Sequence, residues 1–410
     1  MTPEELKGLL LVSSIKIGVV FAVIMIGVIM IIWVERRGSA LLQDRLGPNR
    51  VGPLGLLQNV ADGLKNFTKE EVMPLQADPV IFVMAPMMSF VAAMLLFAVV
   101  PFAAPLPPFD VTLPLIGHVV HEGPVAMVIA NLPVGFLFIL AVSSIAVYGI
   151  VLAGWSSNSK YAFLGALRAS AQMISYEIPL AMSLVVVLLL AGNVPLGDII
   201  AFQQQTTWFV FAATLSWLLF HVATFAETNR MPFDLAEAEA ELVAGFHTEY
   251  SSMKFAMFFI AEYTGLITMS ALIATLFFGG WDIPFTTWDE QEATNWSFGT
   301  LFRVGMTNLF FIGKTFFFAW VYIWVRWTVP RFRFDQVMHL GWKILLPISL
   351  GYIVVMASAV LVLERLGMVH DWKYGMALFA VNVPLVALCV FGLDRDRLLL
   401  GARLRSQAET

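Results

Sequence analysis

Nine long apolar runs, separated by short charged segments, constrain this chain more than any other feature. A helix needs roughly 18 or more apolar residues to cross the ~30 Å hydrocarbon core of a bilayer. Because each run is about that long, the sequence predicts an all-α polytopic membrane protein with about nine transmembrane helices. The runs lie near residues 10–34, 79–101, 125–152, 173–191, 207–225, 254–279, 304–327, 343–363 and 374–393.

Composition excludes several other classes of protein. Of the 410 residues, 59% are hydrophobic and 13% are charged, whereas a soluble domain carries roughly 25% charged residues. A net charge of -5 lacks the basic surplus that nucleic-acid binding needs, so we expect no nucleic-acid partner. The single cysteine, Cys389, cannot by itself form a disulfide, hold an iron–sulfur cluster or build a thiolate zinc site. We therefore expect any electron carrier on another chain.

The distribution of Lys and Arg predicts the orientation of the chain, because cytoplasmic loops carry the excess of these residues. Of the 24 Lys and Arg, 18 lie in one set of alternate loops, five lie in the other set, and Lys314 lies inside a span. This split places the N-terminus outside and the C-terminus in the cytoplasm. The first run has no small-residue cleavage site before Glu35, so we interpret it as a retained span and not as a secretory signal.

An amphipathic helix is predicted near residues 54–70, between the first two spans. Its apolar residues recur at spacings of three and four: Leu54, Leu57, Val60, Ala61, Leu64 and Phe67. We expect the helix to lie flat at the cytoplasmic interface, with its apolar face against acyl chains or a tail-bearing lipid. A plain interfacial anchor fits the periodicity equally well, and Asp62 and Lys65 could form an ordinary surface ion pair.

The inside loop near residues 226–253 is unusually acidic. Between residues 226 and 242 it holds one arginine, Arg230, and five carboxylates, which are Glu227, Asp234, Glu237, Glu239 and Glu241. Crowded carboxylates at low dielectric cannot all ionise, so some of their proton affinities rise. The pattern therefore predicts a proton-accepting cluster. A solvated acidic loop is the alternative.

Three charged residues fall within or at the start of predicted spans: Glu177, Glu262 and Lys314. Ionisable groups at membrane depth are costly unless paired or hydrated, and by default they mark a proton or ion path. Structural buried ion pairs are the alternative. His118 and His121, spaced three apart in an outside loop, would face one way on a helix. With no third ligand evident, we expect them to be structural.

Several exact strings are more specific than these patterns. Glu35-Arg36-Arg37 is followed by further strings at residues 43–53, 61–65, 154–161, 173–179 and 226–250. In this order, from the first span to about residue 363, they resemble the H subunit of proton-pumping NADH:quinone oxidoreductase, respiratory complex I.

The resemblance implies a role within a larger enzyme. In this family the subunit anchors the hydrophilic redox arm to the membrane arm and forms most of a chamber through which quinone reaches the terminal iron–sulfur cluster. It therefore implies quinone as substrate, FMN and iron–sulfur clusters on partner subunits, and no redox centre or metal in this chain. It also implies the plasma membrane of a bacterium. The implied partners are membrane lipids, peripheral quinone-site subunits and small membrane subunits leading to antiporter-like subunits.

Two sets of residues match functional positions of the family. Those matching the quinone chamber are Arg36, Arg45, Asp62, Lys65 and Arg230, with Glu249 in the loop above. Those matching an acidic funnel that passes charge toward the antiporter-like subunits are Glu177, Glu227, Glu237, Glu239, Glu241 and Glu262. The amphipathic helix, the first span and the sixth span match the lipid-facing entrance.

The sequence departs from the family pattern at two places. Ala236 stands where the family usually has proline, so we expect a different local bend. Residues 1–363 form the family-like domain with eight spans, whereas residues 364–410 add a ninth run and a basic cytoplasmic tail. The tail carries Arg395, Arg397, Arg403 and Arg405. A peripheral hydrophobic hairpin is the alternative for the ninth run.

Two other functions remain open from the sequence. One is the homologous membrane subunit of an energy-converting hydrogenase or another complex I-like enzyme, which shares the acidic spans but uses a different electron donor. The other is a secondary transporter working alone, which would also explain buried Glu and Lys residues. No inverted repeat supports the transporter.

The predicted orientation can be tested with a reporter fused after Thr410. We expect a reporter that is active only in the cytoplasm to be active there, because nine spans and the charge split place the C-terminus inside. Activity of a reporter that works only outside the membrane would mean that the ninth run does not span.

Overall fold

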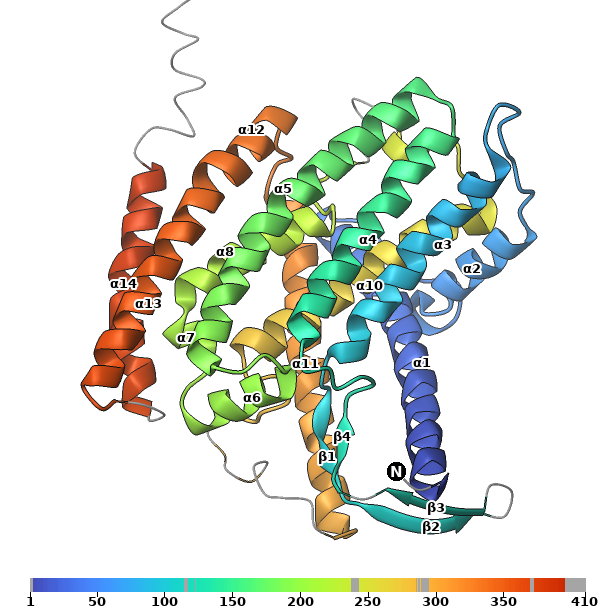
Figure 1. The fold of residues 1–410 in the computed structure, drawn as a ribbon. Helices are drawn as coiled ribbons and strands as arrows, with labels where there is room; N and C mark the ends of the chain where they lie inside the picture. Colours follow the sequence, from blue (N-terminus) through green and yellow to red (C-terminus); the bar gives the residue numbers. More distant parts are fainter. Residues whose placement is uncertain are drawn as a thin grey trace, which may run out of the picture.

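Long helices packed side by side make up most of the structure (Figure 1). The computed structural model describes residues 3–113, 117–121, 123–236, 243–284, 286, 288, 295–368 and 372–394. The helices are α1 (Pro3–Leu42), α2 (Gln58–Thr68), α3 (Pro79–Leu96), α4 (Gly135–Ser156), α5 (Lys160–Ala191), α6 (Leu196–Gln205), α7 (Phe209–Ala212), α8 (Thr214–Glu227), α10 (Ser252–Phe277), α11 (Phe298–Thr328), α12 (Phe334–His339), α13 (Leu346–Arg365) and α14 (Trp372–Asp394). The prediction of an all-α polytopic fold is confirmed.

Within the described residues, eight helices are long and apolar enough to cross a membrane. The fifth of the nine predicted runs differs, because Ala213 is not helical (φ -136°, ψ 49°) and divides it into α7 and α8. The other eight runs are all represented among the long helices, but the run expected near residues 125–152 becomes helical only at Gly135, because residues 125–127 form a strand. The ninth run forms α14, a single helix and not a hairpin.

The central helix of the bundle is α10, which packs against α1, α3, α8 and α11. Its hydroxyl side chains are fully buried, and Thr268 and Ser270 donate to the carbonyl oxygens four residues earlier, at 2.9 and 2.8 Å. These local bonds let the hydroxyl groups of Thr268 and Ser270 lie inside an apolar bundle with their donors paired.

Helices α3 and α4 pack unusually closely. A Cβ atom on Gly149 would lie 2.1 Å from Oγ of Ser89 and 3.0 Å from the carbonyl oxygen of Ala85. Only glycine allows this approach, as small residues do at helix contacts in membranes.

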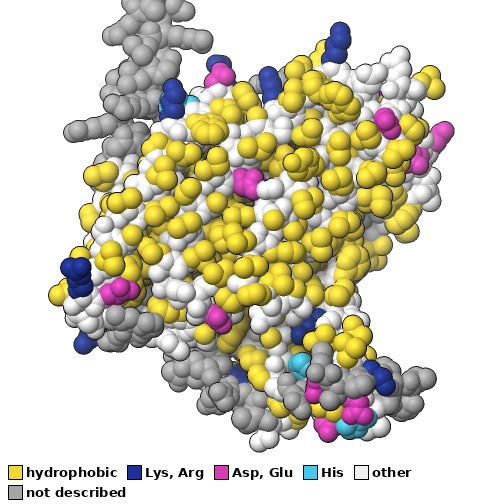
Figure 2. All heavy atoms as spheres, in the orientation of Figure 1, with side chains coloured by type: hydrophobic (Ala, Val, Ile, Leu, Met, Phe, Trp, Pro, Cys, Tyr) yellow, Lys and Arg dark blue, Asp and Glu magenta, His cyan; other side chains and the backbone are white. Residues whose placement is uncertain are grey.

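Apolar side chains cover the flank of the bundle, whereas Lys, Arg, Asp and Glu gather mainly at its two ends (Figure 2). Exposed Leu, Val, Phe and Trp side chains on α1, α3, α11 and α13 contribute to this surface. A flank of this kind is suited to contact with lipid and not with water.

Two small antiparallel two-stranded sheets lie at one end of the bundle, beside the N-terminal end of α1 (Figure 1). Strand β1 (Ala103–Leu106) pairs with β4 (Val125–Met127), and β2 (Phe109–Leu113) pairs with β3 (Gly117–His121). His118 and His121 therefore lie on a strand, where residues three apart face opposite sides. The common helix face that their spacing would allow therefore does not form. His118 instead contacts Asp110 at 2.8 Å and Glu4 at 3.2 Å.

The predicted amphipathic helix is present as α2. It begins at Gln58, after a 3-10 turn at Pro53–Gly55 in which Leu54 has a positive φ of 56°. Leu57, Val60, Leu64 and Phe67 stay 44–69% exposed, so their apolar face is not covered by the rest of the chain.

Candidate functional site

A buried ion cluster joins four segments of the chain. Glu35, near the end of α1, is only 5% exposed. Its carboxylate accepts a hydrogen bond from the Tyr263 hydroxyl at 2.8 Å, lies 3.3 Å from Nη1 of Arg230, and pairs with Arg326 of α11. Glu35, Tyr263 and Arg326 were not predicted as site residues from the sequence, because their partners lie far away along the chain.

Arg230 connects this carboxylate to a second one. Its Nε lies 2.6 Å from Oε1 of Glu262, and its guanidinium carbon lies 4.1 Å from the ring centre of Tyr263. Burial alone would lower the pKa of Arg230, but Glu262, Tyr263 and Glu35 raise it above the ordinary value. Two guanidinium groups thus face two carboxylates, which offsets the cost of burying Glu35 and Arg230 and of partly burying Glu262 and Arg326. We call Glu35, Arg230, Tyr263, Glu262 and Arg326 the ion cluster.

The turn that carries Arg230 is held from its inner side. Gln172 of α5 is fully buried and donates from Nε2 to the carbonyl oxygens of Ala226 (2.8 Å) and Phe233 (2.7 Å). Asn229 has a positive φ of 50°, a conformation that asparagine tolerates better than most residues. A salt bridge of 2.6 Å between Arg331 and Asp234 fixes the outer part of the turn.

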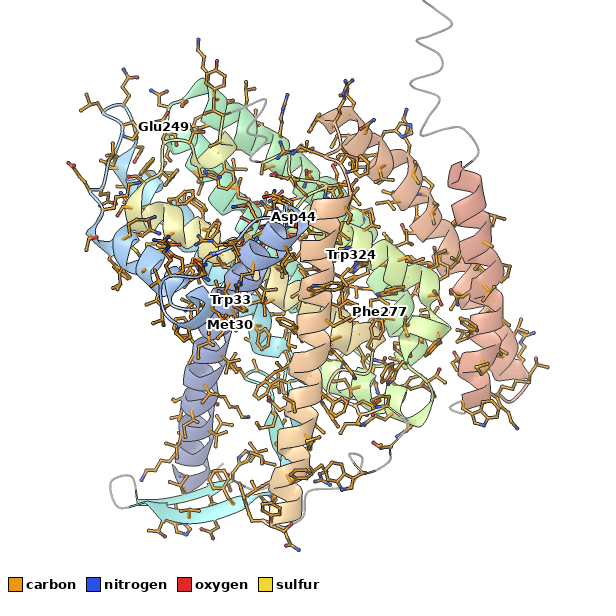
Figure 3. The ribbon with its side chains drawn as sticks, turned by 180° about the vertical axis from the view of Figure 1, so that it is seen from behind. Met30, Trp33, Asp44, Glu249, Phe277 and Trp324 are labelled. Atoms are coloured by element: carbon orange, nitrogen blue, oxygen red, sulfur yellow. The ribbon has the colours of Figure 1, made fainter. Side chains whose placement is uncertain are left out.

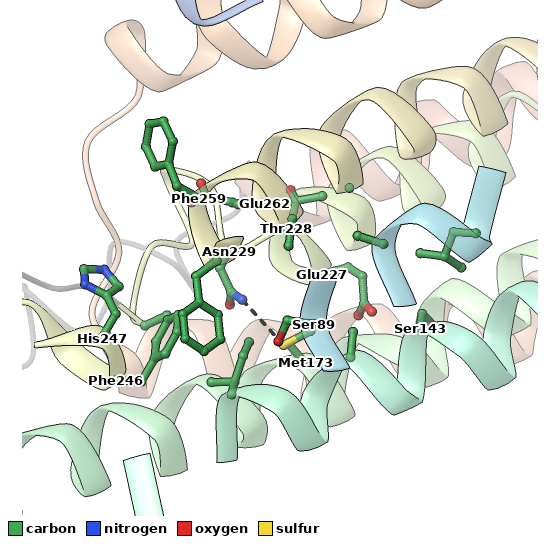
Figure 4. A pocket seen from close by; sticks show the side chains of 18 of the residues that line it. Ser89, Ser143, Met173, Glu227, Thr228, Asn229, Phe246, His247, Phe259 and Glu262 are labelled. Carbon is green, nitrogen blue, oxygen red and sulfur yellow. Dashed lines mark hydrogen bonds between the residues drawn. The ribbon is translucent and has the colours of Figure 1, made fainter. Parts of the chain in front are cut away.

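An apolar cavity lies beside the ion cluster, between α3, α4, α5, α8 and α10 (Figure 4). The volume open to the centres of water-sized molecules is about 110 Å³. Glu227 and Glu262 enter it from different helices, among walls that include Met173, Phe246 and Phe259. Glu262 therefore belongs both to the cavity wall and to the ion cluster.

Glu227 is the more deeply buried of the two cavity carboxylates. It is 8% exposed, and among the described residues its Oε2 has no hydrogen-bond partner. Burying an unbonded carboxylate oxygen disfavours the anion relative to the neutral acid. Glu177 of α5 lies close enough for its charge to act on Glu227, and it accepts a hydrogen bond from Ser144 of α4. The structure thus brings together Glu177, Glu227 and Glu262.

A second charged group lies where α2 meets α1. Arg36 Nη1 is 2.5 Å from Oδ2 of Asp62, and Lys65 Nζ is 3.8 Å from Oδ1. Partial burial opposes ionisation of Asp62, but hydrogen bonds from Arg36 and Gln58 and the charges of Arg36 and Lys65 leave the pKa of Asp62 lowered. Arg36 directly follows Glu35 on α1, so this group adjoins the ion cluster.

The remaining predicted site residues lie elsewhere. Arg45 is exposed and donates to Gln43 at 2.6 Å. Glu249 lies in the turn before Tyr250, well apart from Asp44, the neighbour of Arg45 (Figure 3). Three of the predicted funnel carboxylates, Glu237, Glu239 and Glu241, lie outside the described residues.

Lys314 lies apart from the ion cluster. Its Nζ donates to the carbonyl oxygens of Phe278 (2.7 Å), Gly280 (3.0 Å) and Asp282 (2.6 Å), just beyond the end of α10. It also lies 4.5 Å from the ring centre of Trp208. These contacts favour the structural alternative, since a cation here satisfies the free carbonyl groups at a helix end.

The fold and the site together define a class: polytopic helical membrane proteins that hold carboxylates, some of them paired with arginine, inside the bundle. No group of three or more His, Cys, Asp or Glu suited to a metal ion occurs within the described residues.

Comparison with known proteins identifies the family. The sequence model described as NADH dehydrogenase matches residues 15–357. The chain is 45% identical to the H subunit of NADH-quinone oxidoreductase from Leptospira biflexa, covering 86% of this chain and 95% of the relative. It is 45% identical to the H subunit numbered 1 of Geobacter metallireducens (87% and 98% covered) and 41% identical to that of Cytophaga hutchinsonii (86% and 97% covered). The chain belongs to the family of H subunits of NADH-quinone oxidoreductase.

The ion cluster leads to a prediction about stability. Glu35→Gln should lower the free energy of unfolding by about 3–5 kcal/mol, because it leaves the buried Arg230 and the partly buried Arg326 with one carboxylate. Asp62→Asn, the matched control at a more exposed pair, should cost less than about 1 kcal/mol. Thermal unfolding of the purified protein in detergent compares the two. Equal losses would contradict a structural role of the ion cluster.

Proposed function

We propose that this chain is the membrane subunit of NADH-quinone oxidoreductase that forms the quinone-binding chamber at the junction with the peripheral arm. It couples quinone reduction to proton translocation through its buried carboxylates. The observation that carries the proposal is the double role of Glu262, which pairs with Arg230 in the ion cluster and also lines the cavity that holds Glu227.

The ion cluster is suited to convert a change of charge into a proton transfer. Arg230 contacts both Glu35 and Glu262, so a new anion near this guanidinium would compete with Glu262 for it. A buried carboxylate that loses its cationic partner binds a proton more readily. Reduction of a quinone consumes protons and changes the charge in the chamber, which supplies such a perturbation.

The change of charge at Glu262 then affects the other carboxylates in and beside the cavity. Glu227 shares the cavity with Glu262, and Glu177 acts on Glu227 by its charge. These carboxylates interact through their charges. When one of them gains a proton, the proton affinity of its neighbour falls. In this proposal the path runs from Glu262 through Glu227 to Glu177, and Glu237, Glu239 and Glu241 complete the funnel.

The quinone tail enters beside α2. Polar contacts hold the backbone of this region to its neighbours: Asn59 donates to the carbonyl oxygen of Ile29 at 2.7 Å, Trp33 donates to that of Leu54 at 3.1 Å, and Ser252 donates to that of Asn66 at 2.9 Å. The apolar side chains of α2 remain exposed, as a contact surface for an isoprenoid tail requires. Arg36, Asp62, Lys65 and Arg230 line the chamber, with Arg45 and Glu249 at its margin.

The proposal places the chain in the plasma membrane of a bacterium, with its N-terminus outside and the α2 side in the cytoplasm. FMN and the iron–sulfur clusters belong to partner subunits, and the quinone is ubiquinone or menaquinone. The names of the relatives, at 41–45% identity, favour this function over a hydrogenase subunit or a stand-alone transporter.

Replacing Glu227 tests the proton path. Glu227→Gln should reduce quinone-linked turnover on the order of 10²-fold, because the amide keeps the volume but carries no transferable proton. Electron transfer from NADH to an artificial acceptor should continue. Glu70→Gln, an exposed carboxylate beyond α2, is the matched control. Near-normal turnover and pumping in the Glu227 variant would remove this residue from the path.

Enlarging the apolar face of α2 tests the entrance. Leu57→Trp should raise KM for a long-tailed quinone, because the larger ring narrows the surface along which the isoprenoid tail enters. A short-tailed analogue should be affected less. Leu75→Trp serves as control, since Leu75 is exposed outside the helix. An equal effect of Leu57→Trp on both quinones would leave α2 as an interfacial anchor only.

A further inference from the structure

The interruption between α7 and α8 is bridged by side chains from two later helices. In a continuous helix the carbonyl oxygen of Ala212 would accept a hydrogen bond from the Ser216 N–H. In this structure the Ala212 oxygen accepts from Nδ2 of Asn382 at 2.7 Å, and the Tyr352 hydroxyl lies beside the Ser216 backbone. The Tyr352 hydroxyl also donates to Oδ1 of Asn382 at 2.7 Å. The two side chains together thus replace the helical bond.

Asn382 is fully buried, with an exposed fraction of 0%. Its amide donates to the carbonyl oxygens of Ala212 and, at 3.0 Å, of Leu378, while its oxygen accepts from Tyr352. An amide in an apolar environment is costly unless it is bonded in this way. Its position opposite Ala213, the non-helical residue that divides the fifth run, therefore indicates a specific contact and not general packing.

The helix that carries Asn382 is tightly docked. Helix α14 packs against α7, α8 and α13 (Figure 1). A Cβ atom on Gly375 would lie 1.9 Å from Oγ1 of Thr207, and the rings of Phe379 and Phe211 meet edge to face at 6.0 Å. Because α14 begins at Trp372, it lies beyond residues 15–357, the range matched by the family.

We propose that Asn382 is a positioning residue which, together with Tyr352, closes the break and fixes α8 in place. Helix α8 has 14 residues and ends at Glu227, so a shift at its first turn is transmitted over about 21 Å to the cavity carboxylate. Helix α14 thus sets the place of Glu227 without touching it. This last link rests on the proposed function, whereas the bridging of the break does not.

Hydrogen–deuterium exchange on the assembled membrane complex tests the bridge. Asn382→Leu should speed exchange of the amides near residues 214–218 roughly tenfold, because the backbone groups at the break lose their partners. Tyr352→Phe should also speed exchange of the Ser216 amide. This variant tests the bridge even if Asn382→Leu fails to assemble. Leu378→Ala, which removes a fully buried side chain from the same helix but no polar group, should leave these amides protected.

Unchanged exchange in both polar variants, or equal acceleration in Leu378→Ala, would overturn the bridge. The link to Glu227 is tested separately by the pH profile of quinone-linked turnover. Asn382→Leu and Tyr352→Phe should displace this profile. Leu378→Ala should leave it unchanged. Faster exchange with an undisplaced profile would overturn the link while supporting the bridge. If Glu227→Gln itself has no effect, the proposed function fails, and the exchange result still decides the bridge.

Discussion

The pairing of Glu35 and Glu262 with Arg230 and Arg326 is the interaction on which the rest of the structure depends. It joins α1, the turn after α8, α10 and α11 at one buried point. In a bilayer, apolar side chains gain little by leaving lipid for protein, so polar contacts and close packing decide how helices associate. Glu35 and Arg230 are buried and need their partners there, so the four paired charges impose one arrangement on four segments. The same requirement makes the site sensitive to any added charge, which is the property that the proposed function uses.

Interruptions of the backbone are the second constraint, since an unpaired peptide group is costly where water is absent. At three such interruptions, a polar side chain donates hydrogen bonds to the backbone carbonyl groups. Gln172 binds carbonyl groups on both sides of the turn after α8, and Lys314 binds three beyond the end of α10. Asn382 binds the carbonyl group of Ala212 at the break between α7 and α8. Irregular backbone thus occurs where another helix supplies the missing partner.

These two constraints meet at α8. Its beginning is held by Asn382 and Tyr352, its end is followed by the turn that Gln172 clamps, and Glu227 and Arg230 lie at that end. The helix therefore presents one carboxylate to the cavity and delivers one guanidinium to the ion cluster. Side chains from α5, α13 and α14 thus contact the backbone at both ends of this helix.

The sequence by itself determined the apolar spans, the amphipathic helix and the presence of costly charges at membrane depth. Each of these depends on hydrophobicity or periodicity within one short segment, so neighbouring residues suffice to define it. It also marked Asp62 and Lys65, which are three residues apart on the predicted amphipathic helix. Only the tertiary structure decided which charges pair. The partners of Glu35 are 195, 228 and 291 residues away, and no local pattern encodes such distances. The break at Ala213 is equally invisible in the sequence, because it contains neither Gly nor Pro, and the contact that stabilises it comes from Asn382, 170 residues from Ala212.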